Sequence, residues 1–357
     1  MNAGKIIRRS LGSINLLFVL LMIIVAYSEQ IHPEKHHLLS LLGLTFPFFI
    51  TVNICFACFW IFIGQFRYLL LSLIGFSLCI SQTRSTLPLN LFRATPPEKS
   101  IKLLSYNVMG FNHGLKTKEG NPILHYLKES GADIICLQEY AVSRSKAQLT
   151  QTDVSNALID YPYHKINTAG SLTCYSKYPI LSATPIFKKN GNAAVSYEIQ
   201  IGQDTLTLIN CHLQSNRLTQ EDKDVYEDII VSPKTAKVRE GFHLFAKKLG
   251  EAYAARAPQA ESVAQAIKDS RHRDVIVAGD FNEPPVSYAH HVIGQHLNDA
   301  FAQSGIGFGI SYHLNHFYFR IDNIMLSSGL KSYQCCVDNT ISDSDHYPIW
   351  CFVAKKD

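Results

Sequence analysis

The fold of this chain is decided by the stretch Asp274-Val275-Ile276-Val277-Ala278-Gly279-Asp280-Phe281-Asn282. Its first part is a short apolar run rich in β-branched side chains, which predicts a buried strand. Asp280 and Asn282 follow this run at once. Polar side chains carried at the end of a buried strand lie at one edge of a sheet, and several such strand ends together form a pocket.

Other apolar runs after residue 100 are flanked by polar side chains in the same way. These side chains are acids, amides and imidazoles: Asn107 after 103–106, Glu139 after 134–138, His212 after 208–211, Asp322 at the start of 321–326, and Asp345 with His346 before 347–350. Each is a weak signal alone, since a lone Asp-His pair is more often a surface turn. Their common position at strand ends indicates that they form one polar pocket, a candidate functional site.

The rest of this region alternates short strands with a few helices. We expect strands at 101–106, 133–137, 172–175, 194–201, 205–211, 274–278, 321–326 and 348–353, and helices at 123–130 and about 232–270. Many short strands with few helices are typical of an α+β fold in which two sheets stack and helices lie outside. The prediction is a two-layer β-sandwich flanked by helices.

Six segments, in order, resemble the signature motifs of the endonuclease/exonuclease/phosphatase superfamily, whose fold is DNase I-like. They are Leu104-Ser105-Tyr106-Asn107-Val108, Leu137-Gln138-Glu139, Asn210-Cys211-His212-Leu213, Gly279-Asp280-Phe281-Asn282, Arg320-Ile321-Asp322 and Ser344-Asp345-His346-Tyr347-Pro348. The similarity runs from about Lys102 to Phe352. It implies a metal-dependent phosphoester hydrolase, foremost a phosphodiesterase in which water attacks phosphorus.

The resemblance also implies a Mg²⁺ site, with Mn²⁺ as the alternative ion. Glu139 is expected to be the main ligand, with Asn107 beside it and Asp345 as a further carboxylate of the site. This set suits Mg²⁺, a hard cation that takes one or two carboxylates and keeps waters for the substrate.

The remaining motif residues are expected to act on the phosphate and the attacking water. Asp280 and Asn282 resemble the pair that positions the water and the phosphoryl oxygens, and His212 resembles a donor to the phosphate. His346 paired with Asp322 resembles a general base with its orienting partner, or alternatively a phosphate-binding imidazolium. Donors aimed at the phosphoryl oxygens stabilise the charge of the transition state.

Two features depart from the family pattern. Members that act at abasic sites carry an acidic residue two positions past the first Asn, where this chain has Met109. The tract from Arg217 to Ala260 is also longer than a minimal member needs. We interpret it as a solvated helical face over the sandwich. The alternative is a lid in which Lys237, Arg239 or Arg256 meets phosphate.

Residues 1–82 contain three apolar stretches, at about Leu11–Tyr27, Leu38–Ile63 and Tyr68–Ile80. A hydrocarbon core of about 30 Å needs roughly 20 apolar residues, so the second stretch can cross it and the third is a short or tilted span. A cleaved signal peptide would account only for the first stretch. We therefore expect an anchor of two to three transmembrane helices at 1–82, a linker at 83–101 and the catalytic domain at 102–357.

The flanking charges predict the orientation of this integral membrane protein. Lys5, Arg8 and Arg9 precede the first stretch, and Arg67 lies between the second and third, which favours the cytoplasm for these segments. Three spans then place the catalytic domain on the extracytoplasmic side of an inner or plasma membrane. If the third stretch only lies in the interface, the domain is cytoplasmic, the side that its six cysteines mildly favour.

The substrate is the point at which the sequence leaves alternatives open. A net charge of +4 is too small to indicate nucleic acid or anionic lipid by itself. The anchor favours a lipid head group as the phosphoester, while a membrane-tethered nuclease, a phosphomonoesterase and an inactive scaffold are the alternatives. No protein partner can be read. His113, His313 and His316, with the aromatic run 317–319, are interpreted as surface and packing residues, or alternatively as a pocket mouth.

Overall fold

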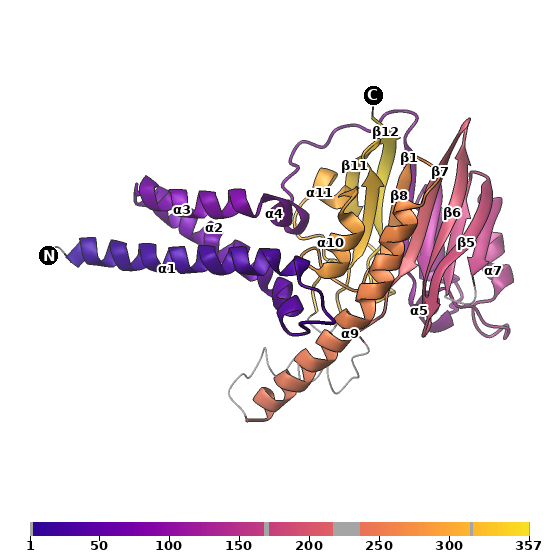
Figure 1. Cartoon of the computed structure of the whole chain (residues 1–357). Helices are drawn as coiled ribbons and strands as arrows, with labels where there is room; N and C mark the ends of the chain where they lie inside the picture. The colour runs from indigo at the N-terminus through magenta and orange to yellow at the C-terminus, as the bar shows by residue number, and fades with distance from the viewer. Residues whose placement is uncertain (1–2, 168–170, 217–235, 315–316, 357) are drawn as a thin grey trace.

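Two stacked β-sheets form the body of the molecule in the computed structural model, which describes residues 3–167, 171–216, 236–314 and 317–356 (Figure 1). Each sheet has six strands in the described chain. Each has a parallel pair at its centre, formed by β1 (Ile101–Asn107) with β2 (Ile134–Gln138) and by β7 (Asp204–His212) with β8 (Val275–Asp280). The predicted two-layer sandwich is confirmed.

All other neighbouring strands in the two sheets are antiparallel. The strand order is β11-β12-β1-β2-β4-β3 in the first sheet and β5-β6-β7-β8-β10-β9 in the second. The remaining strands are β3 (Tyr163–Asn167), β4 (Leu172–Ser176), β5 (Ile180–Lys189), β6 (Asn192–Ile201), β9 (Leu297–Asp299), β10 (Asp322–Ser327), β11 (Leu330–Val337) and β12 (Ile349–Lys355).

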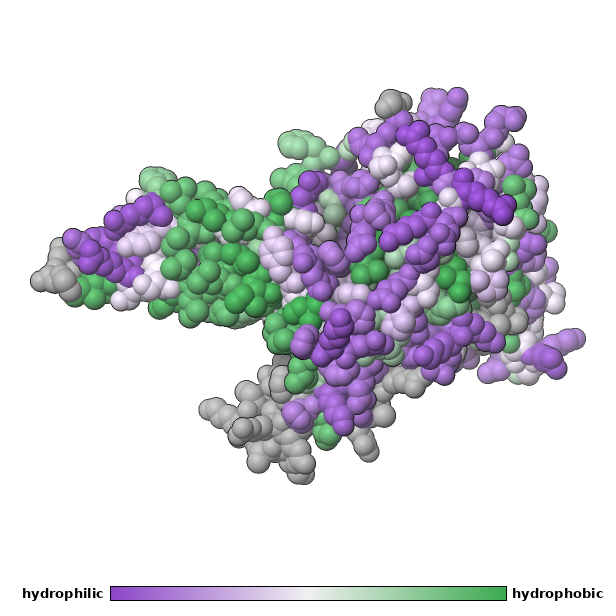
Figure 2. Space-filling model, viewed as in Figure 1, coloured by the Kyte–Doolittle hydropathy of each residue, from purple (hydrophilic) through white to green (hydrophobic). Residues whose placement is uncertain are grey.

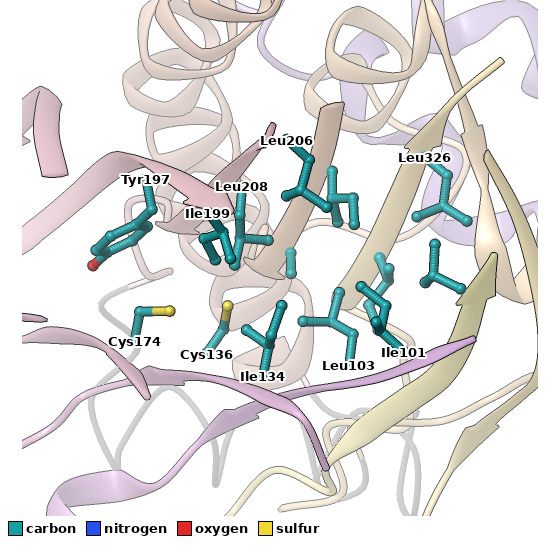
Figure 3. Close-up of a cluster of buried hydrophobic side chains, with 14 of the residues drawn as sticks. Ile101, Leu103, Ile134, Cys136, Cys174, Tyr197, Ile199, Leu206, Leu208 and Leu326 are labelled. Atoms are coloured by element: carbon teal, nitrogen blue, oxygen red, sulfur yellow. The ribbon is translucent and has the colours of Figure 1, made fainter. Parts of the chain in front are cut away.

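The two sheets bury an apolar core between them. Figure 3 shows Leu103, Ile134 and Cys136 of the first sheet facing Ile199 and Leu208 of the second. Successive side chains of a strand point to opposite faces. Residues adjacent to these core positions therefore face outward, where helices cover both sheets.

The outer face of the first sheet packs against α6 (Pro122–Glu129) and α7 (Gln151–Ala157), next to the short turn α5 (Met109–Gly114). The outer face of the second sheet packs against α9 (Ala236–Lys268), which crosses it diagonally, and α10 (Tyr288–Gly294). The short helix α11 (Ala300–Ser304) follows β9. The helices expected at 123–130 and 232–270 correspond to α6 and α9, whose described part begins at Ala236.

The anchor is a bundle of helices that projects away from the sandwich (Figure 1). It consists of α1 (Ala3–Ala26), η1 (Tyr27–Gln30), η2 (Leu39–Thr45), α2 (Phe46–Phe62), α3 (Phe66–Leu78) and α4 (Ile80–Thr86). Two continuous segments are long and apolar enough to cross a membrane, and α3 with α4, bent by 79°, would make a third. Figure 2 shows the apolar surface of this bundle.

A buried polar cluster joins the anchor helices to one another. Trp60 Nε1 donates a hydrogen bond of 2.9 Å to Asn15 Oδ1, and Asn15 Nδ2 lies 3.2 Å from Ser72 Oγ and 3.4 Å from Asn53 Oδ1. Polar side chains that bond across apolar helices stabilise their association where water is absent. The contacts link α1, α2 and α3 into one bundle.

The anchor packs directly onto the segments that carry the predicted site. Val286, four residues after Asn282, is 2% exposed and lies in an apolar cluster with Met22 and Phe46. Gly43 of η2 approaches so closely that a Cβ there would lie 1.8 Å from the carbonyl oxygen of Val286. Arg320, two residues before Asp322, donates to the carbonyl of Ser85 in α4 at 2.8 Å.

Replacing Gly43 by Val tests this junction. The new side chain would collide with the backbone of Val286 and force the anchor off the catalytic domain. Overpacking of this kind costs about 1–3 kcal/mol, so we expect the midpoint of thermal unfolding of the full chain in detergent to fall. Gly294→Ala is the control, because its Cβ would lie 3.7 Å from Met325 Cε, an ordinary van der Waals contact. Equal midpoints for the two variants would contradict the packed junction.

Candidate active site

Strand register places three predicted site residues in one row. His212 ends β7, Asp280 ends β8 and Asp322 begins β10. His212 is paired with Asp280 across the parallel strands, and Asp280 is paired with Asp322 across the antiparallel strands. Neighbouring strands lie about 4.8 Å apart. The three side chains are therefore held at the carboxyl end of the central parallel pair.

The first sheet brings Asn107 and Glu139 to the same place. Asn107 ends β1 beside Gln138 of β2, and Glu139 is the next residue. Asn107 Nδ2 donates to Glu139 Oε1 and to Asp280 Oδ2, both at 3.2 Å. Its amide oxygen accepts from the backbone N–H of Met109 at 3.1 Å. One amide thus joins the carboxylates of the two sheets.

His346 lies between two buried carboxylates. Its Nδ1 is 2.7 Å from Asp322 Oδ2, and its Nε2 is 3.7 Å from Asp280 Oδ2. Burial by itself would lower the pKa of His346, but Asp322 and Asp280 together raise it to about 10. Burial raises the pKa of Asp280, and His346 partly offsets that effect. The arrangement favours an imidazolium at neutral pH.

Asn282 and His212 complete the surroundings of Asp280. The backbone N–H of Asn282 donates to Asp280 Oδ1 at 2.8 Å, and its side-chain amide lies 3.1 Å from Oδ2. His212 Nε2 is 3.6 Å from Asp280 Oδ2 and 3.8 Å from Glu139 Oε1. Within the described residues, both ring nitrogens of the buried His212 lack a hydrogen-bond partner. Buried polar atoms are normally bonded, so His212 is available to a ligand.

Asp345 is the predicted site residue with the loosest attachment to this group. Its carboxylate accepts a hydrogen bond of 3.4 Å from the Ser344 hydroxyl, and the residue is partly exposed. Among the described side chains, no hydrogen bond joins Asp345 to Asn107 or Glu139. Its charge still acts on the site, because it contributes to raising the pKa of the adjacent His346.

One group of donors and one separate carboxylate in the described structure could hold a metal ion. One atom each from Asp280, Asp322 and His346 lie within 4.8 Å of one another. In this group both imidazole nitrogens already face carboxylates. Glu139, by contrast, accepts one hydrogen bond from the described side chains and its side chain is 41% exposed. That carboxylate, with a free oxygen and access to water, fits a hard cation such as Mg²⁺.

The backbone beside Glu139 is held in an unfavourable conformation. Glu139 has φ 53°, and the α5 turn from Met109 to Gly114 is left-handed throughout, with φ between 46° and 76°. Left-handed backbone costs non-glycine residues about 1–2 kcal/mol each. Asn121 supports the turn by donating to the carbonyls of Phe111 and Leu115, both at 2.8 Å.

An open cleft of about 730 Å³ lies next to Glu139 and His212. The left-handed turn forms one wall, and the β5–β6 hairpin at Asn190 forms another. None of the described lining residues is Lys or Arg. His113 lines this cleft, which agrees with the pocket alternative for that residue.

Several residues that hold the site together were not predicted. Gln138 Nε2 donates to Asn210 Oδ1 at 2.8 Å and so links the two sheets below the site. Ser344 Oγ donates to the carbonyl of Asn107 at 2.7 Å, and Ser311 Oγ accepts from the N–H of Asp322 at 3.0 Å. A buried amide inside an otherwise apolar strand was the available signal for Gln138 and Asn210. Ser311 carries no comparable sequence signal.

Arg256 differs from both interpretations of the 217–260 tract. Its side chain is fully buried rather than on a solvated face or at a phosphate, and Nε pairs with Glu283 at 2.7 Å. Nη1 donates to the carbonyl of Gln214 at 2.7 Å. Arg256 therefore ties the segment after His212 to the segment after Asn282. Residues 217–235 and the side chains of Lys237 and Arg239 lie outside the described parts.

This sandwich, with its polar edge, is the DNase I-like class of fold. The endonuclease/exonuclease/phosphatase family model matches residues 104–346, and the chain belongs to this family. A second model, of a domain of unknown function (DUF8431), matches residues 8–86. A comparison with curated proteins gives no match.

Solved structures with a similar fold share little sequence with this chain. A humanised D. rerio TDP2 is 15% identical with a TM-score of 0.49, covering 72% of this chain and 100% of its own. Sphingomyelinase C from Streptomyces griseocarneus is 18% identical with a TM-score of 0.48, covering 72% and 99%. The human Nocturnin catalytic domain is 14% identical with a TM-score of 0.49, covering 75% and 100%.

The Arg256–Glu283 pair predicts a large effect on stability. Removing one partner of a buried ion pair costs about 3–5 kcal/mol because the other charge stays buried without a partner. We expect Arg256→Met to lower the free energy of unfolding by that amount, and Glu283→Gln added to it to restore part of the loss. Denaturant titration of the full chain in detergent measures both.

The exposed pair of Lys116 and Asp153 provides the matched control. Exposed ion pairs contribute about 0–1 kcal/mol, so Lys116→Met is expected to leave the midpoint nearly unchanged. A loss in Arg256→Met no larger than in Lys116→Met would show that the buried pair is not what joins the two segments.

Proposed function

We propose that this protein is a membrane-anchored, Mg²⁺-dependent phosphodiesterase that uses water to cleave a P–O bond. The observation that supports this most is the meeting of strand ends from both sheets. Asn107 bonds to Glu139 and to Asp280, and Asp280 lies beside His212 and His346. Family membership supports the hydrolysis of a phosphoester.

In this proposal Glu139 holds the metal ion, with Asn107 orienting its carboxylate and Asp345 at the rim. Mn²⁺ is the alternative ion, since it also prefers oxygen ligands. A bound Mg²⁺ supplies positive charge for the phosphoryl oxygens. The 3.2 Å contact from Asn107 and the exposure of Glu139 are the structural support.

The histidines and Asp280 act on the phosphate and the water. His212, whose two ring nitrogens have no hydrogen-bond partner in the described part of the chain, donates to a phosphoryl oxygen. His346, oriented by Asp322 at 2.7 Å, donates to another as an imidazolium. Donors already in place where charge develops lower the barrier. Asp280, positioned by Asn282, orients the attacking water.

Hydrolysis of bis-p-nitrophenyl phosphate by the full chain in detergent tests the proposal. We expect turnover with Mg²⁺ or Mn²⁺ and none after chelation. His346→Ala and Glu139→Gln should each lower kcat by about 10²–10³-fold, the effect of removing one donor or ligand aimed at the transition state. His125→Ala, on the exposed side of α6, is the matched histidine control.

The outcomes separate the alternatives. Faster turnover of p-nitrophenyl phosphate than of the diester would indicate a phosphomonoesterase. Equal activity of wild type and His346→Ala would overturn the assigned site. Absence of turnover together with absence of Mn²⁺ binding at Glu139 would support the inactive scaffold.

The proposal places the catalytic domain on the extracytoplasmic side. The N-terminus lies at the end of the anchor remote from the sandwich, and α1 leads from there to the domain (Figure 1). Gly12 packs against Tyr68, so Arg67 lies near the basic N-terminal end. Because basic segments stay in the cytoplasm, the sandwich is expected on the opposite side.

Reporter fusions at the C-terminus test this orientation. Alkaline phosphatase becomes active only outside the cytoplasm, so we expect its fusion to be active. Green fluorescent protein exported by the same route does not become fluorescent there, so we expect its fusion to be dark. The reverse pair of results would place the domain in the cytoplasm. Replacing Lys5, Arg8 and Arg9 by acidic residues should weaken the preference of the N-terminus for the cytoplasm and so reduce the difference between the two reporters.

A further inference from the structure

We infer that the substrate of this site is a membrane lipid with an electroneutral head group, drawn from the bilayer that holds the anchor. This inference rests on the proposed phosphodiesterase activity. Two separate observations support it: an apolar connection from the anchor to His346, and a cleft on the other side of the site whose described lining contains no Lys or Arg.

The apolar connection begins at the anchor. Leu41 and Leu44 of η2, in a segment long and apolar enough to cross a membrane, pack against a cluster of Phe245, Leu249 and Phe317. The rings of Phe245 and Phe317 are 5.6 Å apart. The cluster therefore joins η2, α9 and the loop before β10 in one continuous apolar contact.

The same cluster reaches the catalytic histidine. Phe319 and Tyr312 pack against it, and the Tyr312 ring lies 5.1 Å from the His346 ring with an interplanar angle of 69°. Only one side chain thus separates His346 from the apolar cluster. Phe317 and Phe319 are packing residues, as expected, and they pack between the site and the anchor, whereas Tyr318 is 54% exposed.

Exposed leucines lie next to members of this connection along the chain, and we name them the apolar strip: Leu38, Leu39, Leu244 and Leu314, which are 54%, 48%, 52% and 40% exposed. Figure 2 shows apolar surface at the junction below the anchor. Apolar area removed from water contributes about 25 cal/mol per Å². Because the strip continues from a membrane span, acyl chains of the adjacent leaflet are the occupant that its chemistry fits.

The cleft on the other side of the site selects among head groups. Its described walls offer neutral side chains such as Gln148, Asn190 and Asn192, together with the carboxylate of Glu139 and the imidazoles of His113 and His212. Nucleic acid and polyphosphorylated head groups are bound mainly through Lys and Arg. A zwitterionic head group carries a single phosphate charge, for which the imidazoles of His212 and His346 and the proposed metal ion at Glu139 suffice.

The reaction on such a lipid is a balanced hydrolysis. The oxygen of water forms a bond to phosphorus, one of the two P–O ester bonds breaks, and the departing alkoxide takes up a proton. A phosphomonoester and a free alcohol result, and no oxidant or second substrate is consumed.

The experiment uses the full chain in detergent-free vesicles with Mg²⁺. Phosphatidylcholine vesicles are compared with vesicles containing phosphatidylinositol bisphosphate, with single-stranded DNA and with soluble bis-p-nitrophenyl phosphate. We expect turnover of the zwitterionic lipid. Leu39→Glu combined with Leu244→Glu should lower the ratio of lipid turnover to soluble-diester turnover at least about tenfold, the effect of losing roughly 1.4 kcal/mol of apolar contact.

Leu181→Glu places the same charge on an exposed leucine of β5 and should leave that ratio unchanged. Preferred turnover of DNA or of the anionic lipid would overturn the inference while leaving the phosphodiesterase intact. So would an unchanged ratio in the double variant. Absence of turnover on the soluble diester as well would instead count against the proposed activity itself.

Discussion

Two buried carboxylates in register are the constraint on which the rest of the structure depends. Asp280 and Asp322 face one another across β8 and β10, and they are 1% and 0% exposed. Burying uncompensated charges costs several kcal/mol, so the pair requires a cation and donors nearby. His346 supplies the cation for both acids, and Asn107 and Asn282 supply N–H donors to Asp280. Asp322 Oδ1 has no hydrogen-bond partner among the described residues.

The anchor enters the same network through the chain segments beside these acids. Asp299 is buried against Arg320 at 2.6 Å, and although burial would raise the pKa of Asp299, Arg320 holds it well below its usual range. Arg320 also binds the carbonyl of Ser85, at the end of α4. Residues 83–86, expected to begin a linker, therefore belong to a helix that contacts the residue two positions before Asp322. The N-terminal helical bundle is therefore part of the support of the site.

The sequence predicts the central strands of each sheet better than the edge strands. Each predicted strand is present within two residues of its expected ends, and the strands that were not predicted, β3, β5, β9 and β11, are the outermost strands of the two sheets. Central strands are buried on both faces and read as apolar runs. Edge strands are not buried on both faces, so they lack a continuous apolar run. β5 is mostly exposed or half-buried and contains an exposed proline, Pro185, and the pairing of β11 with β12 contains a register shift. Contacts such as Arg256 with Glu283 join distant segments and leave no local pattern to read.

The packing of the anchor against the sandwich bears on the lipid reaction that we infer. On a flexible tether the mouth of the site would sample all orientations, and each encounter with the bilayer would cost orientational freedom. Here Asn15 and Trp60 bind the anchor helices to one another, and Gly43 seats the bundle against Val286. In the proposed membrane-anchored protein, the height and direction of His346 relative to the bilayer would then be set by folding. Tyr312 separates that histidine from the apolar cluster that contacts Leu41 and Leu44, so the lipid substrate that we infer would present its phosphate while its chains keep apolar contact.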